Sequence, residues 1–118
     1  FLVIVNLKYI YKIIDKDDLK KAKLLGKYSG SSEDLQDGFI HFSGQDQVTS
    51  TLAKYYSGIK NLILLKVETL KLDHLIWEQA SDGNFFPHLY STLDLSNVVK
   101  EFDISLDKNG THILPDIT

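Results

Sequence analysis

The feature that most constrains the fold of this chain is the nearly continuous apolar run at Asn61–Val67, which reads NLILLKV. A strand with one face in water alternates apolar and polar side chains, whereas a strand covered on both faces does not. The run therefore predicts a central strand with protein packed on either side. The chain has 118 residues, enough for one core, so we expect a single domain over residues 1–118 with its core at about 9–115.

Two segments before this run have the pattern of amphipathic helices. In the first, Asp15 or Asp17 can cap the start, lysines gather in the last turn, and Gly26 ends the helix. In the second, apolar residues recur every four positions from Val48, and Gly58 ends the pattern. We therefore expect two main helices.

Strands are predicted on both sides of these helices. The aromatic and β-branched segments Tyr9–Ile14 and Phe39–Phe42 favour strands, and the segment Lys71–Gln79 ends in one. Apolar and polar residues alternate from Glu101 to Asp107 before the turn DKNG, which predicts a hairpin with one wet face. Interspersed helices and strands, with a strand-rich second half, indicate an α+β domain with a mixed or mostly antiparallel sheet.

Two segments are expected to be irregular. The segment Tyr28–Gly38 is rich in Ser, Gly and Asp, which predicts a loop of the long kind that often carries function. The segment Phe85–Leu93 contains Pro87, and a proline cannot donate to a sheet ladder. We therefore expect an edge strand, a bulge or an extended loop there.

Composition narrows the classes of function. The chain has no cysteine, which excludes disulfides and thiolate chemistry and favours a reducing cytoplasm. Its net charge of -3 weighs against a nucleic-acid partner, and no apolar run approaches the roughly 20 residues of a membrane helix. The apolar start Phe1–Val5 lacks the basic leader and cleavage site of a signal peptide. We expect a cytoplasmic protein with a small-molecule ligand and neither a nucleic-acid nor a membrane partner.

His41 is the polar residue most out of place. Alternation in DGFIHFS (Asp37–Ser43) turns Ile40 and Phe42 toward the core, and His41 and Ser43 toward whatever covers the other face. Burying a polar group costs free energy unless it is paired. His41 is therefore either a satisfied structural histidine or part of a site. The four histidines have no close pair and no metal-ligand spacing, so we expect no metal site.

Other polar residues allow the same two interpretations. Glu78 follows the single tryptophan in an apolar strand, and it either serves a site or reaches water or a lysine at the strand end. His88 and Tyr90 share a face if their segment is extended, so they either line a pocket or pack over a sheet edge. Thr51 and Tyr55 lie on one stripe of the second helix, where stacking on a base competes with plain helix packing.

Taken together, these segments resemble a known family. DGFIHFS, the WE at Trp77–Glu78 and the FPHLY at Phe86–Tyr90 fall in the order and spacing of the small bacterial domain-of-unknown-function family 952. The resemblance spans roughly Tyr9–Pro115. It implies an ADP-ribosyltransferase-like fold, with a split sheet around a cleft, and it points to NAD as a cofactor.

The resemblance also implies roles for single residues. In many ADP-ribosyltransferases a histidine anchors the nicotinamide ribose, an aromatic residue stacks on nicotinamide, and a glutamate stabilises positive charge on the ribose as nicotinamide leaves. His41, then Tyr55 or Tyr56, then Glu78 occur in that order here, so we expect His41 and Glu78 to be catalytic. The expected ligand-binding residues are Ser43, Thr51, Tyr55, Phe86, His88 and Tyr90.

Two functions follow as expectations. The first is a protein that binds a nucleotide such as NAD and acts as a glycosyl or ADP-ribosyl transferase or as a glycohydrolase. The alternative is a non-catalytic module that binds a small ligand or a partner. Lys12, which stands where the family often has a histidine, favours the alternative, because a lysine accepts a proton near neutral pH only if its pKa is strongly lowered. The chain also has no arginine, so only lysines or loop amides can hold a pyrophosphate.

Overall fold

The apolar run at the centre of the chain forms strand β4 (Leu62–Glu68), which lies between two other strands. In this computed structural model, which describes residues 8–118, β4 pairs antiparallel with β1 (Tyr9–Asp15) and with β8 (Val98–Leu106). Strand β9 (His112–Ile113) completes this four-stranded sheet, which we call the large sheet. The predicted central strand and C-terminal hairpin are thus confirmed. The apolar start Phe1–Val5 lies outside the described residues.

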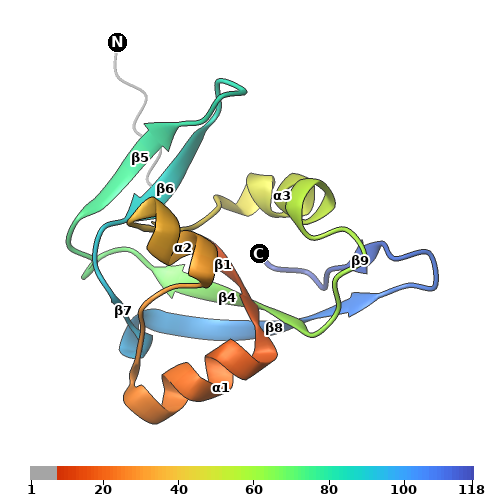
Figure 1. Cartoon of the computed structure of the whole chain (residues 1–118), viewed down its shortest axis with the longest axis horizontal. Coiled ribbons are helices and arrows are strands. Elements are labelled where there is room, and N and C mark those ends of the chain that lie inside the picture. Colours follow the sequence, from red (N-terminus) through yellow and green to blue (C-terminus); the bar gives the residue numbers. More distant parts are fainter. Residues whose placement is uncertain (1–7) are drawn as a thin grey trace.

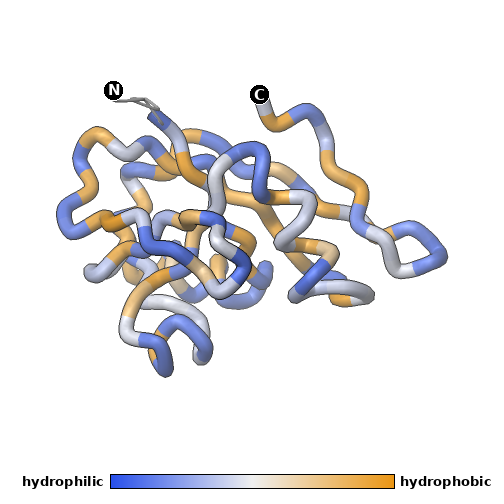
Figure 2. The backbone as a smooth tube through the Cα atoms, turned by 90° about the horizontal axis from the view of Figure 1, so that it is seen from above, coloured by the Kyte–Doolittle hydropathy of each residue, from blue (hydrophilic) through white to orange (hydrophobic). Residues whose placement is uncertain are grey.

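Both faces of β4 are covered, as its uninterrupted apolar pattern predicts. Leu65 packs in one core cluster together with helix α1 (Lys16–Leu25), whereas its neighbour Leu64 packs in a second cluster with helix α3 (Val48–Tyr55). In Figure 2 the turn between β8 and β9, at the right edge, is hydrophilic. Both predicted helices are present. None of the helices within residues 8–118 is long and apolar enough to cross a membrane.

The other elements are short: β2 (Lys27–Tyr28), α2 (Ser32–Asp37), β3 (Ile40–His41), β5 (Leu75–Gln79), β6 (Phe85–Leu89), β7 (Leu93–Asp94) and the 3-10 turns Gln45–Gln47 and Leu95–Asn97. Strands β3, β6 and β5, in that order, form a three-stranded small sheet, and β2 pairs with β7. Every strand pair within residues 8–118 is antiparallel, so the α+β class is confirmed and no pair in this region is parallel.

One bridge connects the large sheet to the end of the small sheet. The backbone amides of Tyr11 and Ser43 each donate to the other residue's carbonyl oxygen at 2.8 Å. Figure 1 shows the β5–β6 hairpin at the upper left and α3 at the upper right, on opposite sides of the chain that leads from β3 to α3. The bridge thus joins the two sheets through their backbones, and beside it Ile10 of β1 and Leu65 of β4 pack in one core cluster with Ile40 of β3 and Leu89 of β6.

The segment Tyr28–Gly38 is not a loop, contrary to prediction. Helix α2 begins after Ser31, whose side chain accepts from the Asp34 amide while the Asp34 side chain accepts from the Ser31 amide. Gly38 ends the helix in the left-handed conformation with φ 85°. Capping groups and not an apolar stripe define this helix, since Asp34 is its one buried residue. A search for apolar periodicity therefore does not detect it.

Pro87 lies in the middle strand of the small sheet, so its expected place at an edge, a bulge or a loop is wrong. Residues of β3 and β6 pair as Ile40 with Leu89 and His41 with His88. One step further, the Phe42 amide donates to the Pro87 carbonyl at 3.0 Å. In a hydrogen-bonded antiparallel pair, each residue donates its N–H to the other residue's carbonyl. Pro87 cannot donate in this way, because proline has no backbone N–H. Pro87 therefore lies where the short β3 ladder ends, and it accepts one bond from Phe42 without returning a second.

Candidate functional site

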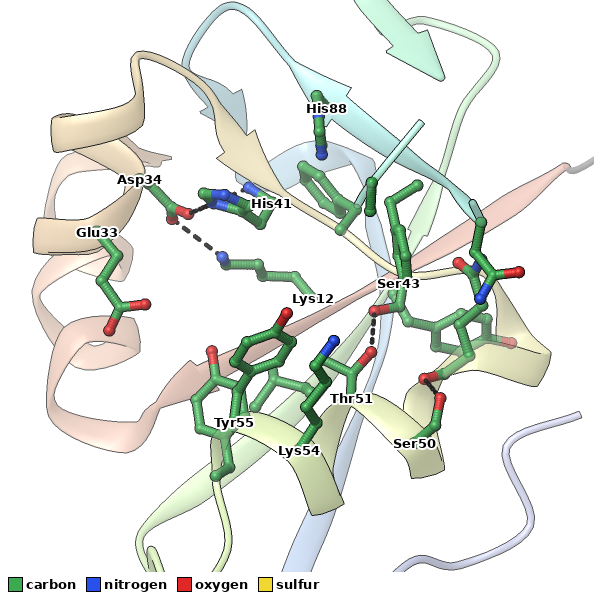
Figure 3. A pocket seen from close by; sticks show the side chains of 18 of the residues that line it. Lys12, Glu33, Asp34, His41, Ser43, Ser50, Thr51, Lys54, Tyr55 and His88 are labelled. Atoms are coloured by element: carbon green, nitrogen blue, oxygen red, sulfur yellow. Dashed lines mark hydrogen bonds and ion pairs between the residues drawn. The ribbon is translucent and has the colours of Figure 1, made fainter. Parts of the chain in front are cut away.

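A cleft of about 500 Å³ lies between β1 of the large sheet, the small sheet, α2 and α3. This volume lies in the range of small-molecule sites. Its walls come from β1, α2, β3, α3, β6 and the β5–β6 turn (Figure 3). The lining residues are Tyr11, Lys12, Ile13, Ser31, Glu33, Asp34, Asp37, His41, Phe42, Ser43, Gln47, Ser50, Thr51, Lys54, Tyr55, Tyr56, Ala80, Asp82, Asn84, Phe86 and His88.

Asp34 is the centre of a buried network at the α2 side of the cleft. Its Oδ2 accepts from Lys12 Nζ at 3.0 Å and from the Ser31 amide at 2.9 Å. Its Oδ1 accepts from the His41 amide at 3.1 Å and lies 2.6 Å from His41 Nδ1. Burial is the largest single influence on the pKa of Asp34 and raises it, but these bonds, led by the one from the His41 side chain, together outweigh burial and hold the pKa well below its ordinary value. One carboxylate thus joins β1, α2 and β3.

Lys12 enters this network from β1, and its exposed fraction is only 3%. Burial lowers the pKa of Lys12 from its ordinary value, and the charge of Asp34 opposes that change. Figure 3 shows the Lys12 side chain reaching along the cleft toward Asp34 and His41. An ammonium group has three donors, and Asp34 is its only hydrogen-bond partner within residues 8–118.

His41 lies between two carboxylates. Its Nδ1 faces Asp34, and its Nε2 lies 2.9 Å from Asp37 Oδ2 at the end of α2. His41 is therefore fully engaged by the protein, and its ring is held in place by α2.

His88 is held differently, because only one of its ring nitrogens has a partner. Its Nδ1 lies 2.8 Å from Glu78 Oε1, which also accepts from the Tyr90 hydroxyl. Phe39 stacks on the His88 ring at 4.0 Å between centroids. No residue in the described part of the chain bonds Nε2, and Figure 3 shows the ring entering the cleft from β6. An oriented histidine with one free nitrogen in a cleft is the arrangement of a general acid or base.

Helix α3 supplies the opposite wall. Gln47, Thr51 and Tyr55 all line the cleft, which follows from their spacing of four residues. Thr51 Oγ1 lies 3.4 Å from Ser43 Oγ, and the Tyr55 ring is 64% exposed. Gln47 ties this wall to the small sheet, since its Nε2 donates to the Phe85 carbonyl at 2.8 Å. The wall thus offers hydroxyl groups near the floor and an aromatic ring at the mouth.

The structure brings most of the sequence-predicted site residues together. Those that line the cleft are His41, Ser43, Thr51, Tyr55, Phe86 and His88. Glu78 and Tyr90 do not line it: Glu78 lies behind His88, and Tyr90 borders a separate hollow of about 300 Å³. His41 and Glu78, expected to act together, form no hydrogen bond or ion pair with each other within residues 8–118: the rings of His41 and His88 meet edge-on at 5.5 Å, and His88 in turn pairs with Glu78.

Sequence reasoning did not assign Lys12, Asp34 and Asp37 to the site. Asp34 belongs to the pattern S-x-x-D at Ser31, which signals a helix start but says nothing of a buried carboxylate. A lysine inside the apolar strand β1 is the one signal that pointed to a buried charge. Within residues 8–118 no group of three or more histidines and carboxylates is arranged to hold a metal ion.

These features define a class of protein: a small α+β domain with a polar cleft between two antiparallel sheets. Comparison with protein-family models then matches residues 13–101 to the family described as "Protein of unknown function (DUF952)". The chain belongs to this family. Comparison with curated proteins finds no match.

Solved structures of one bacterial protein are similar to this chain. The crystal structure of CC0527 from Caulobacter crescentus has 43% identity and a TM-score of 0.84, and the match covers 89% of this chain and 93% of that one. A double mutant of CC0527 gives the same TM-score at 42% identity, with the same coverage. The solution NMR structure of CC0527 has 42% identity and a TM-score of 0.78, covering 93% of each chain.

Proposed function

We propose that this chain binds a small molecule of nucleoside type, a hydroxyl-bearing ring joined to a flat heterocycle, in the cleft between α2, α3 and β6. Three kinds of group on the cleft support this. The exposed Tyr55 ring offers a stacking surface, Ser43 and Thr51 offer hydroxyls, and Lys12 offers spare donors. The observation that carries the proposal is the pairing of this aromatic mouth with a polar floor in one cleft of ligand size.

Titration calorimetry with adenosine as the probe tests the proposal. We expect saturable binding to the wild-type chain and at least about tenfold weaker binding to a Tyr55→Ala variant, since stacking of a base on an aromatic ring contributes about 1–3 kcal/mol. Phe85→Ala is the matched control, because Phe85 is an exposed aromatic residue of β6 that does not line the cleft. No binding to the wild type, or equal loss in both variants, contradicts the proposal.

A second candidate function is hydrolysis of the bond between sugar and heterocycle, and the Glu78–His88 pair favours it. His88, oriented through Nδ1, can donate a proton from Nε2 to the departing heterocycle as the bond between the heterocycle and the sugar carbon breaks. Water adds to that sugar carbon, and the proton that the water releases returns to His88 Nε2. In this proposal Glu78 orients His88, because its Oε1 already accepts from His88 and Tyr90.

Release of adenine from adenosine tests this second function. We expect a His88→Gln variant to lose about 10²–10⁴-fold in rate, the usual contribution of a general acid. His74→Asn is the control: His74 is an exposed residue outside the cleft with φ 65°, a conformation that asparagine tolerates. Binding without release by the wild type would leave the chain as a binding module, and equal release by His88→Gln would remove His88 from the reaction.

NAD, to which the family resemblance points, is supported only in part. Its nicotinamide riboside half would meet Tyr55 and the hydroxyl groups, as the expected order of His41 and Tyr55 suggests. Its pyrophosphate would need a bidentate arginine or free backbone amides, and the chain has no arginine. The residues present therefore do not fit the whole dinucleotide.

A further inference from the structure

The charges around the cleft carry an inference that deepens the proposed function and rests on it. We infer that the cleft accepts an uncharged nucleoside and rejects the corresponding phosphate ester, with Lys12 donating to a hydroxyl or carbonyl oxygen of the ligand.

One of the two lysines on the cleft is neutralised within the protein. Lys12 Nζ forms an ion pair with Asp34 at 3.0 Å, and both side chains are almost completely buried. Lys54 has no ion pair within residues 8–118, and its Nζ lies 5.2 Å from the centroid of the Tyr55 ring. The chain has no arginine, so Lys54 is the one lysine on this cleft left for a phosphate, and it cannot make the bidentate contact of an arginine.

Carboxylates outnumber these lysines along the same walls. Asp34, Glu33 and Asp37 come from α2, and Asp82 comes from the β5–β6 turn. Glu33 and Asp82 have no ion pair within residues 8–118. The charges of Glu33 and Asp34 add to the effect of burial in raising the pKa of the cleft residue Tyr56 to about 12. A phosphate with a charge of about −1.5 to −2 would enter a negative field.

Three backbone amides of residues beside the cleft are occupied by the protein itself. The Ser31 amide donates to Asp34 Oδ2, and the Asp34 amide donates to Ser31 Oγ, so the start of α2 is capped by its own side chains. The Gly44 amide donates to Gln47 Oε1 at 2.8 Å. The amide groups that often hold phosphates are therefore not available at these two points.

An uncharged sugar, unlike a phosphate, can form hydrogen bonds with both Lys12 and the carboxylates of the cleft. Its hydroxyls can accept from the two unused donors of Lys12 and donate to the unpaired carboxylates of Glu33 and Asp82. A hydroxyl group both donates and accepts, whereas a phosphate only accepts near its full charge. The same side chains that repel a phosphate can thus bind a sugar.

Calorimetry with adenosine and AMP as paired probes tests the inference. For the wild type we expect AMP to bind at least about tenfold more weakly than adenosine, a difference of about 1.4 kcal/mol. Neutralising an exposed carboxylate of the cleft in Glu33→Gln or Asp82→Asn should shift the ratio of the two affinities toward AMP by about threefold or more, and added salt should shift it the same way. Asp103→Asn is the matched control, since Asp103 on β8 is 85% exposed outside the cleft.

The outcomes separate the inference from the proposed function. If AMP binds as tightly as adenosine, or if Asp103→Asn shifts the ratio as much as the cleft variants do, the inference is wrong and the binding function stands. If neither probe binds to the folded wild type, the proposed function fails and the inference fails with it. A Lys12→Met,Asp34→Asn double variant, which removes the ion pair without leaving a buried charge, should weaken adenosine binding about tenfold, and unchanged binding would exclude Lys12 as a ligand donor.

Discussion

Replacing Asp34 by asparagine should destabilise the fold more than any other single polar substitution at the cleft. Asn has nearly the shape of Asp, but it carries no charge and has one acceptor oxygen in place of two. The four groups that Asp34 serves are Lys12 Nζ, the Ser31 amide, the His41 amide and His41 Nδ1. The variant therefore leaves the Lys12 charge buried and unpaired and leaves part of these donors without an acceptor.

The size of the effect follows from these partners. Removing one member of a buried ion pair costs about 3–5 kcal/mol. Lys12 can limit the loss by releasing its proton, which from an ordinary pKa of about 10.4 costs about 4.6 kcal/mol at pH 7. Because burial already lowers the pKa of Lys12, deprotonating this lysine costs less than about 4.6 kcal/mol, and this cost limits the loss of stability. We expect Asp34→Asn to lose about 3–4 kcal/mol, a large part of the usual 5–15 kcal/mol of a small domain.

Urea denaturation followed by the fluorescence of Trp77, the single tryptophan, measures this loss. Asp37→Asn is the matched control: Asp37 also contacts His41, but its side chain is 50% exposed, so we expect a loss of at most about 1 kcal/mol. The Lys12→Met,Asp34→Asn double variant should recover much of the stability, since it leaves no buried charge. Equal small losses in both single variants would refute the buried network as a source of stability.

Two further predictions follow from the same network and its helix. The pKa of Asp34 is lower in the folded chain than its unfolded value of about 3.9, so the stabilisation from Asp34 is complete above that pH and is lost as the pH falls. In urea titrations the free energy of unfolding of the wild type should therefore fall steeply below about pH 4. This fall should be weaker in Asp34→Asn. Ser31→Ala removes the side-chain cap of α2 and should cost about 1 kcal/mol by thermal or urea unfolding, whereas the neighbouring exposed Ser32→Ala should cost much less, and equal losses would argue against the cap.

Local sequence patterns predicted the elements that form whatever other element packs against them. The unbroken apolar run of β4 and the period of α3 depend only on which faces are buried, and both are present as expected. The alternation around His41 also held: Ile40 and Phe42 are buried, and Ser43 lines the cleft. These predictions needed no knowledge of the partner elements.

The features that were missed depend on distant partners. Helix α2 has a 66% exposed Leu35 and no apolar stripe, and its Asp34 is anchored by Lys12 and His41 from other strands. The position of Pro87 depends on how short β3 is. Glu78 and His88 meet because the register of β5 and β6 places Ile76 opposite His88, which makes Glu78 its diagonal neighbour. The register of a strand pair and the length of its ladder depend on both strands, so neither can be predicted from one segment of the sequence.

The central claim is that an uncharged nucleoside-type molecule binds in the cleft between α2, α3 and β6. The most direct measurement is heteronuclear NMR of the wild-type chain during titration with adenosine, followed by assignment of every shifted signal. The account predicts that the largest shifts gather at Lys12, Thr51, Tyr55, Phe86 and His88, which line one cleft. Shifts gathered instead at the β8–β9 hairpin or at the hollow beside Tyr90, or a spectrum that adenosine leaves unchanged, would contradict it.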